Sequence, residues 1–408
     1  MIPPPSSVLV VGAGLAATQV VSALRETGFG GRVVVLGAEG LPPYDRPPLS
    51  KHLLDRTTPA WLADEVGTDL LALADEVHLA TPARGLQVHD DGATVLTEHG
   101  AHRADVVVVA TGAHAVRPAR WPAARTLHTA QDADALRAAL RPGDRLAVVG
   151  AGWIGAEVAG VAARAGVDVT VVEAGPAPLT GALGASVGAL TAPWYAEHDV
   201  RLLTGAPVDR VDDEGVRLAD GGRVRADVVL AAVGARPATA WLGTALPREP
   251  DGALRVDEGF AVLGAPRHVR AVGDVALRRS ARHGWVPGGH WDGALRDPQT
   301  LVADLLHPGD APHADRAPYV FSTQLGRELT LLGAASPADE VVLRGDPRSG
   351  EGWTALWFRA GSSTLTAVLT VDRPRDVGAA RRLFTAPALA ELDRSRAADP
   401  ALPLRATR

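Results

Sequence analysis

Two segments of the chain follow the same pattern, in which a short apolar run leads into a turn rich in small residues. Val8–Val11 precedes the first turn, Gly12–Ala17, and Leu146–Val149 precedes the second, Gly150–Gly155. Consecutive apolar residues are typical of a parallel strand buried on both faces, and a GxGxxG/A pattern after such a strand favours dinucleotide binding. Two copies therefore predict an α/β protein with two Rossmann-like dinucleotide-binding domains.

The small residues of this pattern have different roles. The first permits a tight turn, the second lets the backbone approach a pyrophosphate, and the third allows close packing of a helix on its strand. The helix that follows directs its N-terminal amides at the phosphates. These positions are Gly12, Gly14 and Ala17 in the first copy, and Gly150, Gly152 and Gly155 in the second.

An acidic residue follows the second predicted strand of each copy. Glu39 comes after Arg32–Leu36, and Glu173 comes directly after Val167–Val172. A carboxylate at this position binds the ribose hydroxyls of a dinucleotide. Because Glu173 would repel the 2′-phosphate of NADPH, the second copy is predicted to prefer NADH.

Three further apolar runs are predicted to be strands that end in the nucleotide sites. Two of them are predicted to lead from one nucleotide domain to the next, and the third delivers an aspartate. An alternative for this aspartate is a plain helix cap. The runs and the residues at their ends are Val106–Ala110 with Thr111 and Gly112, Val228–Ala232 with Gly234, and Val269–Val272 with Gly273 and Asp274.

Composition excludes several classes of function. The 408 residues suffice for two or three domains, and the absence of cysteine excludes a redox-active disulfide and a Cys-held iron–sulfur cluster. The net charge of −6 does not favour nucleic acid or an anionic membrane as a partner.

The sequence begins without a signal-peptide pattern, and no apolar run is as long as a membrane span, so we expect a cytoplasmic protein. The Arg-rich, Ala-rich composition suggests a bacterial source.

Lys51 is the only lysine in the chain, and it ends the segment Pro43–Lys51. A lysine supplies a compact ammonium whose proton responds to its surroundings, whereas an arginine remains charged. The two adjacent prolines, Pro47 and Pro48, restrict the backbone, which suits a loop that holds a group against a ligand. The alternative is a surface lysine without a function.

Together these motifs resemble the FAD-dependent, NADH-linked ferredoxin reductases that serve bacterial oxygenases and cytochromes P450. The resemblance covers essentially the whole chain, and it implies a small α+β interface domain after the two nucleotide domains. The matching segments are Gly12–Ala17, Pro43–Lys51, Ala110–Gly112, Gly150–Glu157, Gly273–Asp274, Pro318–Tyr319, Asp372–Asp376 and Ala380–Arg382. The domains it implies are an FAD domain at residues 1–113 and 245–317, an inserted NAD domain at 114–244, and a C-terminal interface domain at 318–408.

The resemblance also assigns roles to individual residues. It implies that Lys51 lies near flavin N5 and pairs with Glu157. It places the other FAD contacts at Gly12, Gly14, Ala17, Glu39, Arg46, Ala110, Thr111, Gly112, Gly273, Asp274, His290 and Trp291, and the NADH contacts at Gly150, Gly152, Gly155, Glu173 and Gly234. Neither Lys51 nor Glu157 is expected to belong to a hydrophobic core.

Several positions depart from the family's pattern. Ala38 replaces an acidic residue beside Glu39, and Gly289 and Thr323 replace a glutamate and an aspartate expected near the flavin. Ala174 and Ala177 stand where arginines commonly follow the second ribose acid. His290 compensates as a polar neighbour of the flavin or is an ordinary packed histidine.

The resemblance implies transfer of electrons from NADH through FAD to a ferredoxin. An alternative is a flavoenzyme that acts directly on a small metabolite or on oxygen, and a third is a flavoprotein whose NADH-dependent state controls a partner. Arg278, Arg279 and Arg282 form a basic run that is either a docking rim for an acidic ferredoxin or a solvated loop. The sequence leaves the acceptor, the pathway and the choice between monomer and homodimer open.

Overall fold

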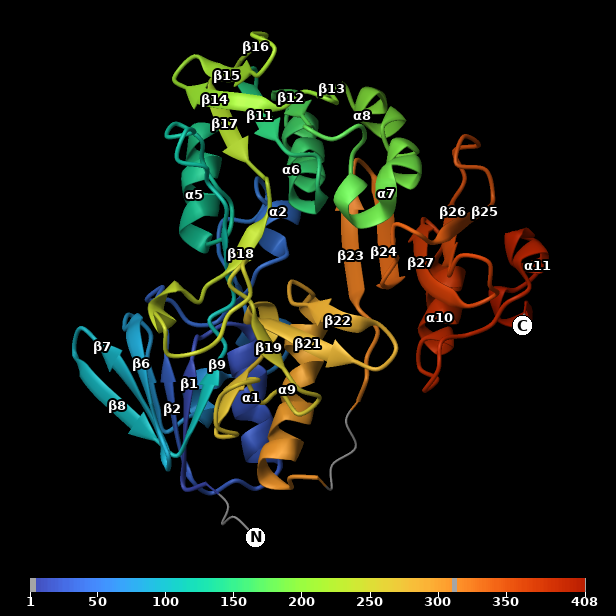
Figure 1. The fold of residues 1–408 in the computed structure, drawn as a ribbon. Helices are drawn as coiled ribbons and strands as arrows, with labels where there is room; N and C mark the ends of the chain where they lie inside the picture. Colours follow the sequence, from blue (N-terminus) through green and yellow to red (C-terminus); the bar gives the residue numbers. More distant parts are fainter. Residues whose placement is uncertain (1–4, 310–313, 408) are drawn as a thin grey trace. The chain divides into compact units, whose positions relative to one another are not determined.

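The computed structural model of the protein describes residues 5–309 and 314–407, which form two compact units of three segments each (Figure 1). Each unit is described by itself below. Unit 1 comprises Met1–Asp45, Ala60–His114 and Arg236–Tyr319, and unit 2 comprises Arg46–Pro59, Ala115–Ala235 and Val320–Arg408.

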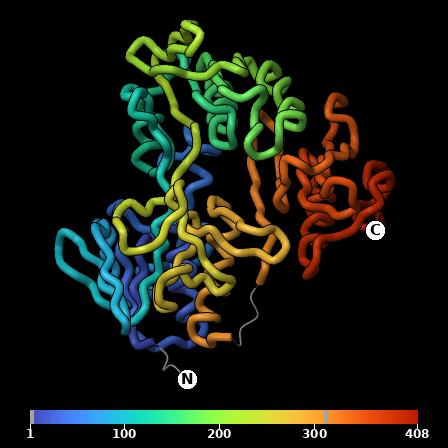
Figure 2. Tube along the Cα trace, in the orientation of Figure 1, coloured from blue at the N-terminus to red at the C-terminus, as the bar shows by residue number. Residues whose placement is uncertain are grey.

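Unit 1 is built on a five-stranded sheet in the order β20-β9-β1-β2-β5, in which every neighbouring pair is parallel. Helices α1 and α9 pack against each other in this unit, and Figure 2 shows the early and late chain segments of unit 1 side by side. The strands are β1 (Ser7–Val11), β2 (Arg32–Leu36), β5 (Glu76–His78), β9 (Val106–Val109) and β20 (Val269–Ala271), and the helices are α1 (Leu15–Glu26) and α9 (Trp291–Leu306).

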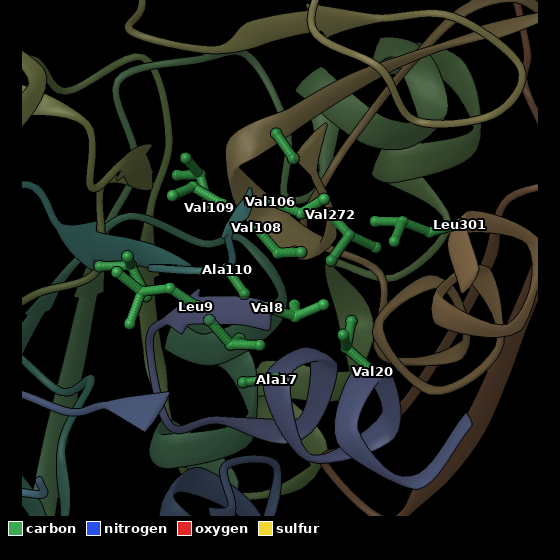
Figure 3. Close-up of a cluster of buried hydrophobic side chains, with 14 of the residues drawn as sticks. Val8, Leu9, Ala17, Val20, Val106, Val108, Val109, Ala110, Val272 and Leu301 are labelled. Atoms are coloured by element: carbon green, nitrogen blue, oxygen red, sulfur yellow. The ribbon is translucent and has the colours of Figure 1, made fainter. Parts of the chain in front are cut away.

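The core of unit 1 forms because both faces of this sheet are covered. Val8, Val10 and Val108 have no exposed surface, as expected for strands that read as continuous apolar runs. Figure 3 shows strand residues such as Val8 and Val108 packed beside Ala17 and Val20 of α1 and Leu301 of α9.

The remaining elements of unit 1 surround the sheet. They are the antiparallel strands β6 (Ala83–His89), β7 (Gly92–Thr97) and β8 (Gly100–Ala104); the sheet β19 (Leu254–Val256), β21 (Ala276–Ser280) and β22 (Gly284–Pro287); the pair β3 (Tyr44–Asp45) and β4 (Ala60–Trp61); and the short helices α3 (Leu62–Glu65), α4 (Leu70–Leu73), η1 (Ala240–Leu242) and η2 (Gly273–Val275). Strands β10 (Ala113–Ala115) and β18 (Ala235–Pro237) lie where the chain passes between the units.

Unit 2 contains a second parallel sheet, in the order β13-β12-β11-β17. Its elements are β11 (Arg145–Val149), β12 (Asp168–Val172), β13 (Arg201–Leu203), β17 (Val228–Ala231), the antiparallel strands β14 (Val208–Asp212), β15 (Gly215–Leu218) and β16 (Arg223–Arg225), and the helices α2 (Pro48–Lys51), α5 (Ala130–Ala139), α6 (Trp153–Arg164), α7 (Thr180–Ala189) and α8 (Pro193–Glu197).

Unit 2 also holds the C-terminal sheet, in the order β23-β24-β27-β26-β25. The strands β24 to β27 pair antiparallel, and Trp353, Ala355 and Leu369 belong to the same apolar cluster as Val148 of β11. The elements are β23 (Tyr319–Gln324), β24 (Arg327–Gly333), β25 (Glu340–Arg344), β26 (Trp353–Phe358), β27 (Leu365–Val371), α10 (Pro374–Leu383), α11 (Arg394–Ala398) and η3 (Leu404–Ala406).

The predicted fold class is confirmed: two parallel Rossmann-like sheets and a separate, mostly antiparallel C-terminal sheet are present. The strand that ends at the first glycine turn begins at Ser7 and the one at the second begins at Arg145, each one residue earlier than predicted. The C-terminal helix α10 begins at Pro374, since proline suits the first turn of a helix.

A buried ion pair holds α10 against the C-terminal sheet. Arg344 is 2% exposed, and its Nε donates to Asp376 Oδ2 at 3.0 Å. The same guanidinium donates to the carbonyl oxygens of Ala397 and Leu402, at 3.3 and 2.5 Å. Thr354 donates to Asp376 Oδ2 at 3.0 Å. The Arg344–Asp376 pair thus links α10 to the C-terminal sheet and to the residues near the C-terminus through hydrogen bonds.

Arg344→Met removes the cation and leaves Asp376 and the carbonyl groups buried without it. We expect the free energy of unfolding to fall by about 3 kcal/mol, because breaking a buried pair is costly even though Arg373, whose Nε lies 3.3 Å from Asp376 Oδ2, remains as a second cation. Arg348→Met is the matched control, since the Arg348 side chain is 92% exposed and faces Asp346. Denaturant unfolding followed by circular dichroism measures both; equal midpoints for the two variants contradict the expectation.

Candidate functional site

The first glycine turn lies in unit 1, between β1 and α1. Gly12 has a φ of +117°, and a Cβ built on it would lie 2.1 Å from the carbonyl oxygen of Ala110. Gly14 is the N-cap of α1, where no side chain caps the helix and no acidic residue lies in the first turn. A Cβ on Gly14 would meet open space. The first amides of α1 are therefore accessible to an anion.

The second glycine turn lies in unit 2, between β11 and α6, and it repeats this geometry. Gly150 has a φ of +104°, and its Cβ would lie 2.4 Å from the carbonyl oxygen of Ala232. Gly152 is the uncapped N-cap of α6 and again faces open space. A Cβ on Gly155 would lie 2.0 Å from the Gly150 oxygen, so the third position must be glycine here, whereas Ala17 fits in the first copy.

Both predicted ribose acids are held in place by neighbours in their own unit. Glu173 Oε2 accepts a hydrogen bond from the Ala151 amide and Oε1 accepts one from the Gly175 amide, both at 2.7 Å. The carboxylate thus lies against the glycine turn that it was predicted to serve. In unit 1, the buried Tyr44 hydroxyl donates to Glu39.

Lys51 and Glu157 form an ion pair within unit 2. Pro47 and Pro48 start the short helix α2 and Lys51 ends it, while Glu157 lies on α6. The Ser50 hydroxyl donates to Glu157 Oε2 and the Ser322 hydroxyl donates to Glu157 Oε1, both at 2.5 Å. The Lys51 side chain is 15% exposed.

Neither residue belongs to a hydrophobic cluster of the described chain, but Glu157 is buried: it is 5% exposed and lies on the buried face of α6. Burial of a carboxylate is costly unless donors surround it. The two serine hydroxyls supply these donors, and sequence reasoning missed them together with Gln324. Two features of the sequence could have indicated them: Ser50 stands directly before Lys51, and polar residues recur at every second position of β23, at Ser322 and Gln324.

A third group of predicted residues lies in unit 1, around the start of α9. Asp274 Oδ1 accepts a hydrogen bond from the Gly289 amide at 3.1 Å, and Trp291 Nε1 donates to Asp45 Oδ1 at 2.7 Å. His290 precedes Trp291, and burial lowers the pKa of its ring. The His290 Nδ1 atom is buried and has no hydrogen-bond partner within the described part of the chain, which fits a polar ligand at this position.

The remaining predicted residues are distributed over both units. Arg46 lies in unit 2, where its Nη1 donates to the His128 carbonyl at 2.6 Å. Thr111 lies in unit 1 and donates to the Ala238 carbonyl at 2.8 Å. Gly112, Gly234 and Gly273 all have positive φ angles, of +69°, +109° and +78°, so each of the three strand ends turns in a way that favours glycine.

The basic run was predicted as either a docking rim or a solvated loop, and for two of its arginines both alternatives are wrong. The side chains of Arg278 and Arg282 are 8% and 6% exposed, and both pair with Asp315. Arg278 also faces Asp297 at 3.7 Å, and burial raises the pKa of Asp297 to about 6. Only Arg279 of the three is exposed, at 63%, with Glu258 beside it.

Three classes of chemistry find no support. The chain has no cysteine, and the residues that the structure describes contain no cluster of His, Asp or Glu suited to a metal ion. None of the helices described is long and apolar enough to cross a membrane.

Two open glycine turns, each at the end of a parallel strand and each followed in the sequence by an acidic residue, are typical of a protein that binds two dinucleotides. Residues 6–295 match the pyridine nucleotide-disulphide oxidoreductase family, and residues 319–408 match the reductase C-terminal family. The chain belongs to the pyridine nucleotide-disulphide oxidoreductase family, and it is a flavoprotein oxidoreductase that uses FAD and NAD(H). The predicted resemblance is thereby confirmed.

The relatives include reductase components of oxygenase systems. The chain is 33% identical to the anthranilate 1,2-dioxygenase system ferredoxin--NAD(+) reductase component of Burkholderia cepacia, over 97% of this chain and 98% of the relative. It is 32% identical to the benzene 1,2-dioxygenase system ferredoxin--NAD(+) reductase subunit of Pseudomonas putida, over 94% and 93%.

Among solved structures, Fdr9 is 40% identical with a TM-score of 0.87, and the match covers 98% of this chain and 99% of Fdr9. The reductase in the covalent putidaredoxin reductase–putidaredoxin complex is 26% identical with a TM-score of 0.88, and the match covers 98% and 97%. Both likenesses extend over the nucleotide-binding sheets and the C-terminal sheet.

Substitutions in the second glycine turn separate folding from nucleotide binding. Gly152→Ala adds a methyl group in open space at the N-cap, so we expect unchanged thermal unfolding and weaker NADH binding, because the methyl group occupies the pyrophosphate position. Gly150→Ala forces a strained backbone against Ala232, so we expect a loss of stability of about 1 kcal/mol or more. Thermal melts and NADH titrations distinguish the two; Gly152→Ala that binds NADH as tightly as the wild type contradicts the assignment.

Proposed function

We propose that the protein is an NADH:ferredoxin reductase that takes a hydride from NADH and passes electrons singly to a ferredoxin serving an oxygenase or a cytochrome P450. The observation that carries the proposal is the pair of open glycine turns in a chain that also fixes one lysine against a buried glutamate. The relatives described above, which are reductases of dioxygenase systems, support the same activity.

Unit 1 is proposed to hold FAD and unit 2 to hold NADH. The Gly12 turn, Glu39 and Asp274 would bind the FAD, with Arg46 on its pyrophosphate side and His290 and Trp291 near the ring. The Gly150 turn and Glu173 would bind NADH. These roles correspond to functional domains at residues 1–113 with 245–317, 114–244 and 318–408.

FAD, when bound, accepts two electrons as a hydride and releases them one at a time, as a one-electron iron–sulfur acceptor requires. The proposed role of Lys51 is to stabilise negative charge on the ring with its ammonium group, and that of Glu157 is to keep this ammonium oriented. A cytoplasmic location is proposed because NADH and ferredoxin occur there together.

A second candidate is a flavoenzyme that reduces a small metabolite or oxygen directly. It is favoured by the changes at Gly289 and Thr323, where the family has carboxylates. The Thr323 hydroxyl donates to Glu328 at 2.9 Å, so it does not reproduce the aspartate's charge. This candidate has the same cofactors and differs only in the acceptor.

The experiment is a spectroscopic assay of the purified protein. We expect a yellow protein with non-covalent FAD in a 1:1 ratio, bleached by NADH without oxygen and reoxidised by an added [2Fe–2S] ferredoxin from a dioxygenase system. Reoxidation by oxygen or a metabolite alone, with no transfer to any ferredoxin tested, supports the second candidate. A colourless protein that cannot be reconstituted with FAD contradicts both.

Glu173→Ala tests the nucleotide preference. In the wild type we expect NADH to reduce the flavin faster than NADPH by on the order of tenfold or more, because Glu173 repels the 2′-phosphate. The variant removes the carboxylate and frees the Ala151 and Gly175 amides, so most of this preference should disappear through faster reduction by NADPH. Stopped-flow reduction of the flavin measures both rates.

Asp168→Asn is the matched control, because Asp168 is an exposed acid at the opposite end of β12. It should retain the wild-type preference. An equal preference for NADH in the wild type and in Glu173→Ala refutes the role given to Glu173.

A further inference from the structure

We propose that Ser322, with Gln324 behind it, is a positioning residue that holds the Glu157 carboxylate against Lys51. The inference rests on the proposed function, in which Lys51 acts on the flavin. It adds a specific contribution of the C-terminal sheet to that reaction. All the residues involved belong to unit 2.

Strand β23 places both residues on one face. Ser322 and Gln324 are two positions apart, so their side chains point the same way, and they are 1% and 2% exposed. Phe321 and Thr323, on the other face, are partly exposed. This alternation brings two polar side chains into a buried environment, where polar groups persist only with partners.

The hydrogen bonds from Gln324 to Ser322 and from Ser322 to Glu157 all point from donor to acceptor in the same order. Gln324 Nε2 donates to Ser322 Oγ at 3.1 Å, and Ser322 Oγ donates to Glu157 Oε1 at 2.5 Å. A hydroxyl has one proton to donate. Because the amide of Gln324 already occupies an acceptor lone pair of Ser322, the hydroxyl proton is directed at Glu157.

Three donors fix both oxygens of the Glu157 carboxylate. Oε1 accepts from Lys51 and Ser322, and Oε2 accepts from Ser50 at 2.5 Å. An ionised carboxylate only accepts hydrogen bonds, which matches an environment of donors alone. Ser50 is adjacent to Lys51 on the same short helix, whereas Ser322 comes from a different element and therefore fixes the carboxylate independently of α2.

The hydrogen bond from Ser322 affects Lys51 because both residues donate to the same oxygen, Glu157 Oε1. The Lys51 Nζ also lies 5.3 Å from the centre of the Phe321 ring, which precedes Ser322 on β23. Loss of the Ser322 hydroxyl lets the carboxylate rotate, so the ion pair opens more often and the Lys51 side chain is accessible to a reagent for more of the time.

The single lysine makes this measurable without any assay of turnover. The rate at which trinitrobenzenesulfonate modifies Lys51 is followed by peptide mass spectrometry on the FAD-containing protein, and the N-terminal amine is the internal reference. We expect Ser322→Ala to accelerate Lys51 modification by on the order of tenfold, as for the loss of one hydrogen bond to a charged group. Glu157→Gln should accelerate it at least as much.

The double variant decides whether Ser322 acts through Glu157. If it does, Ser322→Ala combined with Glu157→Gln reacts no faster than Glu157→Gln alone. A wild-type rate in Ser322→Ala, or additive effects in the double variant, overturns the proposal.

Three further variants control for structural damage. Thr370→Ala removes a buried hydroxyl from β27 of the same sheet, Thr370 being 1% exposed, and should leave the modification rate unchanged. Ser322→Thr retains the hydroxyl and should restore the wild-type rate. Ser322→Cys supplies a weaker donor of similar size and should give an intermediate rate, so it replaces Ser322→Ala if that variant does not fold.

A second readout separates this inference from the proposed function. The flavin reduction potential is measured by spectroelectrochemical titration of Lys51→Met and Ser322→Ala. Lys51→Met removes the cation that the reduced flavin is proposed to have nearby, and Ser322→Ala leaves that cation less firmly held. Both should therefore lower the potential, and Lys51→Met should lower it more. Accelerated modification with unchanged potentials supports the Ser322–Glu157 link and overturns the position assigned to Lys51. Unchanged modification overturns the link itself.

Discussion

The position of Lys51 depends on one buried carboxylate, that of Glu157. A charged group removed from water is costly unless hydrogen-bond donors replace its hydration, and Glu157 obtains its donors from α2 and β23, which are far apart in the sequence. Residues 46–59 accordingly belong to unit 2, although the segments before and after them belong to unit 1. The fold of residues 46–59 thereby determines where Lys51 lies.

A second set of contacts holds residues 46–59 in unit 2. Leu53 is 1% exposed in the core of unit 2. Arg137 of α5 donates to the carbonyl oxygens of Leu53 and Arg56, at 2.9 and 2.6 Å. The short helix α2 has only four residues and would not persist alone. Packing and these hydrogen bonds therefore fix Lys51 before any ligand is present, and a preformed site loses less entropy when it acts.

The sequence was sufficient for most of the fold because the decisive patterns are local. An apolar run before a glycine turn predicted the strands, and the positive φ angles of Gly12 and Gly150 explain why glycine is favoured at both positions. Contacts between distant residues were beyond such reasoning. The basic run was visible in the sequence, but its acidic partner was not. Asp315 pairs with Arg278 and Arg282, which are 37 and 33 positions away. Likewise, the contact of Ser322 with Glu157 could not be predicted, because the two residues are 165 positions apart and meet only in the folded chain.

The family is named for a disulphide, and this chain has no cysteine to form one. No protein thiol can therefore hold electrons between donor and acceptor, and the protein's own contribution is limited to binding, orientation and charge. Only one of its cations is a lysine, and that cation is held by a carboxylate whose oxygens are both occupied by donors. Since the electrostatic effect of a fixed charge depends on its distance from the reacting group, the hydroxyls that keep Glu157 in place would act, in the proposed reaction, as positioning groups for Lys51.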